Sequence, residues 1–193
     1  DKLQAWATRH FAAYLEKKGR RIIGWDEILG DEDIPRSAVG MSWHSAPSRI
    51  KGIKFADFVS GAAGALRGHD MIMAHRTHCY FDYAQGLADD PFQYMGRGLS
   101  LKKVYSYDPY EGVPDSARKH VLGGQCCLWG EFIWNPIDFS WKMWPRALAM
   151  AEILWSYPRD RDFVAFAQRA TVHRDRLVRR GYVCAPMPEM MER

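Results

Sequence analysis

Four short runs of apolar and small residues are the feature that most limits how this chain can fold. They occupy residues 20–25, 38–43, 71–74 and 121–126. Their apolar parts are continuous rather than alternating, which is typical of strands that are covered on both faces. Stretches with helical periodicity lie between them. Alternation of strands and helices favours an α/β fold with a parallel sheet.

Aromatic residues follow these runs, and in three cases an acidic residue comes one or two positions later. The pairs are Trp25–Asp26, Tyr80–Asp82 and Trp129–Glu131, while Trp43 ends the second run without an acid. The carboxyl ends of parallel barrel strands form the edge where active sites are built. An aromatic ring can stack on the C–H face of a sugar, and carboxylates accept hydrogen bonds from its hydroxyls. The pattern therefore predicts part of a carbohydrate-active site.

Helical periodicity predicts which side chains turn inward. Helices are expected over residues 2–18, 61–66, about 145–155 and about 162–180. The inward stripes are Leu3, Trp6, Ala7, Phe11, Tyr14 and Leu15 in the first, Leu148, Ala151 and Trp155 in the third, and Phe163, Phe166, Ala170 and Leu177 in the last. Residues 45–60 are expected to form a long loop with one helical turn. Residues 83–118, which contain several glycines and prolines, are expected to form a functional loop or lid.

The composition limits the class of protein. The 193 residues fit one domain but are short for a complete eight-stranded barrel of about 250 residues. The net charge of +4 is modest, and the late arginines are expected on a solvated helix face rather than in a nucleic-acid site. The sequence contains no run long enough to span a membrane and no signal-peptide pattern, and the spacing of its four cysteines indicates no disulfide framework. Eight tryptophans are expected to serve both a large aromatic core and sugar stacking.

Several motifs in a fixed order resemble glycoside hydrolase family 20, the β-N-acetylhexosaminidases. They are I-I-G-W-D-E-I-L at 22–29, H-C-Y-F-D-Y at 78–83, G-G-Q-C-C-L-W-G-E at 123–131 and W-P-R-A-L-A-M-A-E-I-L-W-S at 144–156. The resemblance implies a (β/α)8 TIM barrel, of which this chain is similar to the second half, strands five to eight with the final helices. It implies a catalytic-domain part over residues 1–193, with the barrel half at about 1–156 and a terminal helix at about 160–181.

The resemblance also implies roles for six side chains. Trp25, Trp43 and Trp129 match tryptophans that enclose the 2-acetamido group and the sugar face, Tyr80 matches the tyrosine that donates to the acetamido oxygen, and Asp82 and Glu131 match acids that bind sugar hydroxyls. Members of the family release terminal N-acetylglucosamine or N-acetylgalactosamine. In their retaining mechanism the acetamido oxygen is the nucleophile and a glutamic acid is the acid–base catalyst. No cofactor is implied.

The family's catalytic Asp-Glu pair, which follows strand four in an H-x-G-G-D-E-like motif, has no counterpart in this sequence, and neither does the sugar-binding arginine of strand one. Asp26–Glu27 follows Gly24–Trp25 and so belongs to the strand-five tryptophan motif. Adjacent residues of a strand point to opposite faces, so at most one of these two carboxylates is expected to face the site. The simplest expectation is that the first half of the barrel lies elsewhere. Residues 45–60 and His75–Arg76 also depart from the family pattern.

Other interpretations remain open from the sequence. Trp25 and Trp43 could be core residues, Trp141 and Trp144 could be either packing or sugar subsites, and Cys126 and Cys127 fit strand core. His75, His78 and Cys79 lack a fourth ligand and zinc spacing, so no metal site is expected. The expected partners are the glycan and the first half of the barrel or a second copy of the chain, with no nucleic acid or membrane. Alternative functions are a non-catalytic sugar-binding half barrel and a truncation product that oligomerises through open sheet edges. Only family habit favours a periplasmic or secreted location.

Overall fold

The chain forms two compact units. The first contains residues 1–76 and 109–125, and the second contains residues 77–108 and 126–193. The computed structural model describes residues 2–44, 60–87, 90–91, 98–156 and 160–187. Most of the expected loop at 45–60 therefore lies outside the described residues.

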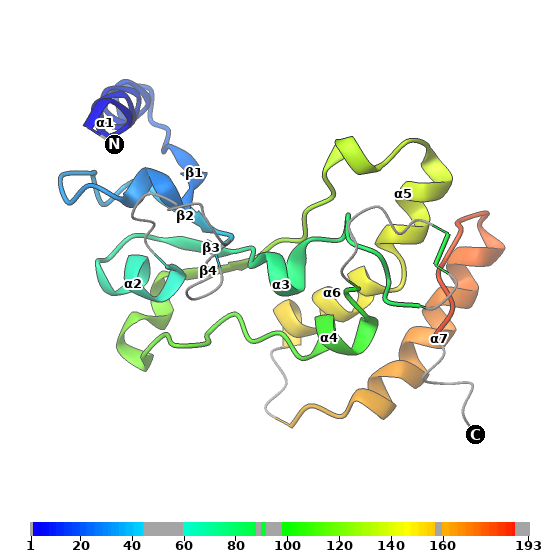
Figure 1. The fold of residues 1–193 in the computed structure, drawn as a ribbon. Helices are drawn as coiled ribbons and strands as arrows, with labels where there is room; N and C mark the ends of the chain where they lie inside the picture. The colour runs from blue at the N-terminus through cyan, green and yellow to red at the C-terminus, as the bar shows by residue number, and fades with distance from the viewer. Residues whose placement is uncertain (1, 45–59, 88–89, 92–97, 157–159, 188–193) are drawn as a thin grey trace, which may run out of the picture. The chain divides into compact units, whose positions relative to one another are not determined.

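A parallel sheet forms the centre of the first unit. Its strands are β1 (Ile23–Trp25), β2 (Val39–Ser42), β3 (Met71–Met73) and β4 (Val121–Gly124), and they lie side by side in that order (Figure 1). All three neighbouring pairs are parallel. The α/β class and the four strands expected from the apolar runs are confirmed. Each strand is shorter than its run, because β1 starts after the beginning of its run and β2, β3 and β4 end before theirs.

Helices of the first unit are α1 (Lys2–Glu16), α2 (Gly61–Leu66) and the short 3-10 helices η1 (Asp26–Leu29) and η2 (Asp115–His120). The Ser60 side chain caps α2 by accepting a hydrogen bond from the Ala63 amide. Glycines let α2 lie close to β3: a Cβ on Gly64 would be 2.5 Å from the Met71 sulfur. The small-residue helix expected at 61–66 is thus confirmed, and its glycines allow this close packing.

The predicted inner stripe of α1 is wrong. Leu3, Trp6, Phe11 and Tyr14 are 56 to 77% exposed, and the buried residues of α1 are Ala5, Thr8 and Ala12. Periodicity identifies side chains that share a face but does not determine whether another element covers that face. Among the described residues of the first unit, the small-residue face of α1 is the one that is packed.

Helices make up most of the second unit. They are α4 (Leu101–Tyr105), α5 (Pro136–Met143), α6 (Arg146–Ser156) and α7 (Phe163–Arg179), with a 3-10 turn η3 (Gly130–Phe132), and α3 (Arg76–Cys79) begins at the last residue of the first unit. Helices α4, α5 and α7 all contact α6. The rings of Tyr105 in α4 and Phe166 in α7 stack with centroids 4.4 Å apart. This helical packing buries Phe166, Ala167 and Ala170, in agreement with the central part of the predicted α7 stripe.

Three further expectations need correction. In α6, Ala151 and Trp155 are exposed, Trp155 by 91%, and the buried residues are Arg146, Ala149, Met150 and Ile153. The stretch 83–118 contains α4 and η2 and is not one long loop. Helix α5 was not expected, although Asn135 accepts hydrogen bonds from two amides at its start and Pro136 is its first residue, which are ordinary start signals.

In the part of the chain that the structure describes, no helix combines the length and the apolar character needed to cross a membrane.

A close approach of two glycines generates the first prediction. A Cβ on Gly98 would lie 2.5 Å from the Cα of Gly86, and Gly86 has a φ of +77°. Because backbone cannot move aside cheaply, Gly98→Ala should lower the free energy of unfolding by about 1–3 kcal/mol. Urea unfolding followed by circular dichroism measures the change. Gly130→Ala is the control because a Cβ there meets nothing within 4 Å; equal stability of both variants would contradict the prediction.

Candidate functional site

Residues at the carboxyl ends of β1 and β2 form a polar cluster in the first unit. Trp25 is the last residue of β1, and η1 starts directly after it with Asp26 and Glu27. Trp43 and His44 follow the neighbouring strand β2. Because β1 and β2 are parallel with Trp25 aligned to Met41, these residues lie at the same edge of the sheet. Trp25 and Trp43 are both half-buried.

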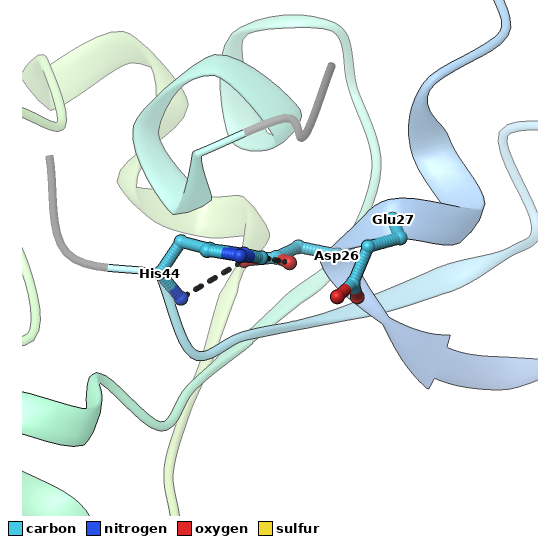
Figure 2. Close-up of side chains that lie close together, drawn as sticks. All are labelled: Asp26, Glu27 and His44. Atoms are coloured by element: carbon cyan, nitrogen blue, oxygen red, sulfur yellow. Dashed lines mark hydrogen bonds and ion pairs between the residues drawn. The ribbon is translucent and has the colours of Figure 1, made fainter. Parts of the chain in front are cut away.

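The Asp26 carboxylate is completely buried and organises this cluster. Its Oδ2 accepts hydrogen bonds from the amides of Trp43 and His44 at 3.1 and 3.2 Å. Its Oδ1 lies 2.7 Å from Nδ1 of His44, which is also buried (Figure 2). Burial raises the pKa of Asp26 to about 6, while the hydrogen bond and the charge of His44 act in the opposite direction. Both carboxylate oxygens are therefore occupied by protein donors.

Glu27 reaches the same segment as Asp26. Its Oε1 accepts a hydrogen bond from the indole Nε1 of Trp43 at 3.0 Å. The expectation that these adjacent carboxylates point to opposite faces is wrong, because η1 is a 3-10 helix rather than a continuation of the strand. Ligand atoms of Asp26, Glu27 and His44 lie within 4.8 Å of one another, a spacing that could suit a metal ion. Hydrogen bonding already accounts for this spacing.

Tyr80 and Trp129 meet in the second unit. Tyr80 forms a parallel bridge with Cys127, supported by the hydrogen bond from the Phe81 amide to the Cys127 carbonyl at 2.7 Å. This pairing places the Tyr80 ring edge-on to the Trp129 ring, with centroids 5.7 Å apart at 63°. Tyr80 is 9% exposed and Trp129 is half-buried. The sequence pattern paired each of these aromatic residues with an acid, and the structure additionally brings the two rings into contact.

Asp82 and Glu131 differ in their surroundings. Asp82 is 1% exposed, and its Oδ1 has no hydrogen-bond partner among the described residues. Burial raises the pKa of Asp82 to about 6; Glu131 adds to this rise, whereas Lys142 and Arg146 oppose it. Glu131 lies in η3 and is exposed. Asp82 is in a turn rather than a strand, so the expected strand geometry does not relate it to Tyr80.

Two buried cations hold the segment that carries Asp82, and sequence analysis did not identify them. The Lys142 ammonium donates to the Asp82 carbonyl at 2.7 Å. The Arg146 guanidinium lies 4.9 Å from the centroid of the Phe81 ring. Burial lowers the pKa of Arg146 to about 9, which leaves it a cation at neutral pH. Arg146 donates hydrogen bonds to the carbonyls of Phe81, Tyr83, Ala84, Leu99 and Lys142.

The remaining candidates have structural contacts. His78 stacks on Tyr107 with centroids 5.1 Å apart, and the His75 Nε2 lies 3.3 Å from the Ser42 hydroxyl. The Trp141 indole donates to Asp90 at 3.2 Å, which agrees with a packing role. Of the six predicted site residues, Trp25 and Trp43 belong to the first unit, and Tyr80, Asp82, Trp129 and Glu131 belong to the second.

Comparison with known proteins gives consistent matches. Residues 1–158 match the family model "Glycosyl hydrolase family 20, catalytic domain". A beta-hexosaminidase of Porphyromonas gingivalis is 32% identical over 86% of this chain and 20% of that protein. The beta subunit of Sus scrofa beta-hexosaminidase is 41% identical over 47% of this chain and 17% of that protein. The structure of a GH20 exo beta-N-acetylglucosaminidase from Vibrio harveyi with N-acetylglucosamine has a TM-score of 0.81 and 29% identity, over 96% of this chain and 28% of that one.

The parallel α/β fold and these matches define a glycoside hydrolase domain. The chain belongs to glycosyl hydrolase family 20. The resemblance drawn from the four motifs is confirmed. The chain spans about a fifth of the Porphyromonas gingivalis relative and 28% of the Vibrio harveyi structure.

Arg146 generates a stability prediction. Arg146→Met removes the donor that several carbonyls share in a region closed to water, and unpaired buried polar groups are costly. We expect the free energy of unfolding to fall by at least about 3 kcal/mol, because each buried carbonyl left without a donor costs about 1–3 kcal/mol. Urea unfolding measures it. Arg176→Met, at an exposed position of α7, is the matched control, and a similar small loss in both variants would show that Arg146 is dispensable.

Asp82 generates a pH prediction. Its folded pKa of about 6 is above the ordinary value of 3.8, so the stability associated with its neutral form is complete below 3.8 and is lost as pH rises through about 6. Asp82→Asn cannot ionise. We expect the variant to gain about 2 kcal/mol relative to the parent chain between pH 4.5 and pH 7.5, measured by urea unfolding at both pH values. Asp160→Asn, at an exposed carboxyl, should show no such gain; a pH-independent difference for Asp82→Asn would refute the prediction.

Proposed function

We propose that this chain is the C-terminal part of the catalytic domain of an exo-acting β-N-acetylhexosaminidase. In this proposal its four parallel strands are strands five to eight of a (β/α)8 barrel. The complete enzyme hydrolyses terminal N-acetylglucosamine or N-acetylgalactosamine from glycans with retention, using the substrate's own acetamido oxygen as nucleophile. Family membership supports the reaction class, and the order of the motifs supports the position within the barrel.

The edge-on contact of Tyr80 with Trp129 is the observation that carries this proposal. An acetamido group has an apolar methyl that suits an aromatic wall and a carbonyl oxygen that needs a fixed hydrogen-bond donor. Trp129 supplies such a wall, and Tyr80 carries a phenolic hydroxyl beside it. We assign the Tyr80 hydroxyl to the acetamido oxygen, which it would hold against the anomeric carbon.

Carboxylates of the second unit are proposed to bind sugar hydroxyls. Glu131 is exposed, and its carboxyl oxygens can accept hydrogen bonds. Oδ1 of the buried Asp82 has no hydrogen-bond partner among the described residues, and a sugar hydroxyl would supply a donor. In the first unit we propose that Trp25 and Trp43 are aromatic contacts to the sugar.

The acid–base pair of the reaction is proposed to lie outside this chain. Asp26 and Glu27 are the only adjacent Asp-Glu pair in the sequence that follows a strand run. Within the first unit both oxygens of Asp26 accept hydrogen bonds from Trp43 or His44, so Asp26 could protonate a leaving group only by losing one of them. Oε1 of Glu27 accepts a hydrogen bond from the Trp43 indole. We therefore assign general acid–base catalysis to the missing first half of the barrel.

Exposed apolar surface on the first unit supports the proposal that the first half of the barrel packs against it. The stripe of Leu3, Trp6, Phe11 and Tyr14 on α1 is exposed, as is Ile23 in the edge strand β1. Leu122 in the other edge strand, β4, is 57% exposed. An edge strand presents unpaired backbone groups that favour pairing with another strand. We propose that the first half of the barrel, or failing that a second copy of this chain, covers these surfaces.

Hydrolysis of a chromogenic N-acetyl-β-glucosaminide tests the proposed function. The 193-residue chain alone should bind N-acetylglucosamine weakly and release no chromophore, and supplying the first half of the barrel should restore release. Trp129→Ala should reduce binding at least tenfold, the effect of losing about 1.4 kcal/mol of aromatic contact.

Other outcomes of the hydrolysis and binding experiments would distinguish the alternative functions. Turnover by the chain alone would refute the claim that its acid–base pair lies elsewhere. Binding with no turnover even after the first half is supplied would favour a sugar-binding module. Absence of binding, together with self-association in light scattering, would favour a truncation product.

A further inference from the structure

Every hydrogen-bonding group of Trp43 is held by another residue of the first unit. Its amide donates to Asp26 at 3.1 Å, and its indole N–H donates to Glu27 at 3.0 Å. Its carbonyl accepts from the Arg76 amide at 3.0 Å. These three bonds come from two different elements, η1 and α3, so both the backbone and the ring of Trp43 are fixed.

His44 adds a contact on the ring. Its imidazole centroid lies 3.8 Å from that of Trp43, tilted by 36°. The imidazole is itself held by Asp26 Oδ1 at 2.7 Å and is 1% exposed. Asp26 therefore acts on Trp43 twice, through the amide and through the neighbouring ring.

The choice of carboxylates for these positions has a physical reason. One Asp26 side chain accepts from three N–H groups, which an amide side chain with one acceptor oxygen cannot match in the same geometry. Burying such a group is costly unless it is fully hydrogen-bonded, as it is here. A half-buried tryptophan could otherwise adopt several rotamers, and ordering a side chain on binding costs about 0.5–1.5 kcal/mol.

We propose that Asp26 and Glu27 are positioning residues that hold the Trp43 indole in the orientation required to contact the sugar. This assignment rests on the sugar-binding role proposed for Trp43. It gives Asp26 and Glu27 a role other than acid–base catalysis, and both act through Trp43 rather than on the substrate. The feature responsible is the 3-10 geometry of η1, which turns both carboxylates toward the end of β2.

The test distinguishes the effect of the hydrogen bond between the Trp43 indole and Glu27 from the effect of the Glu27 charge. Glu27→Met keeps the length of the side chain but removes its acceptor, and Glu27→Gln removes the charge but keeps an acceptor oxygen. Glu32→Met is the matched control, since Glu32 is exposed. Two quantities are measured on the 193-residue chain by nuclear magnetic resonance. They are the hydrogen-exchange rate of the Trp43 indole N–H, assigned from its loss in Trp43→Phe, and the dissociation constant for N-acetylglucosamine.

We expect Glu27→Met to accelerate indole exchange at least tenfold and to raise the dissociation constant about threefold to tenfold. Glu27→Gln and Glu32→Met should stay within twofold of the parent chain in both quantities. Far-ultraviolet circular dichroism of each variant verifies that the fold is retained. If Glu27→Met loses the fold, the comparison of Glu27→Gln with the parent still tests whether an acceptor alone suffices.

Three results with the variants would overturn the proposal. Unchanged indole exchange in Glu27→Met would show that Glu27 does not hold the ring, and a Glu27→Gln variant as impaired as Glu27→Met would show that charge rather than the hydrogen bond matters. Accelerated exchange with unchanged sugar affinity would show that the orientation held by Glu27 does not matter for sugar binding. If the parent chain binds no N-acetylglucosamine, the sugar role of Trp43 fails, and the exchange data still report whether Glu27 holds the ring.

Discussion

Arg146 is a fully buried cation whose hydrogen bonds go to backbone carbonyls of the second unit. Residues 81–84 form neither helix nor strand, so they lack the regular hydrogen bonds that would otherwise fix them. A guanidinium with five N–H donors can satisfy several such carbonyls at once. The segment that carries Asp82 therefore depends on a side chain 64 positions later in the sequence. This constraint explains how an irregular turn can present a side chain in one orientation.

In the first unit a buried negative charge, rather than a positive one, fixes an irregular segment. The Asp26 carboxylate collects amide N–H groups from Trp43 and His44, just beyond the end of β2, where the ladder can no longer pair them. In each unit a buried charge thus replaces regular hydrogen bonding directly after a strand or a bridge. Those segments carry Trp43 and Asp82, two of the residues proposed to contact sugar. Fixing them in advance reduces the ordering cost of binding a small ligand.

Several sequence-based expectations failed for one common reason. The stripe on α1 and the predicted inner face of α6 were assigned from periodicity, yet Trp6 and Trp155 are exposed, while Arg146 is buried. Periodicity reports which side chains share a face of a helix. Whether that face is covered depends on elements distant in the sequence. The placement of Asp26 and Glu27 on opposite faces failed for a different reason, because it assumed that the strand continued into them, whereas they begin a 3-10 helix.

The sequence by itself determined the α/β class, the four strands and family membership, because continuous apolar runs and long ordered motifs are local properties. It also indicated Tyr80 and Trp129 as separate site candidates, each with its own acid, and only the structure brought their rings into contact. Only the tertiary structure decided that Asp82 is buried beside Lys142 and Arg146, and that Asp26 and Glu27 both reach Trp43. The physical reason is that burial and hydrogen-bond partners arise from contacts between residues 16 to 60 positions apart, which no local pattern encodes.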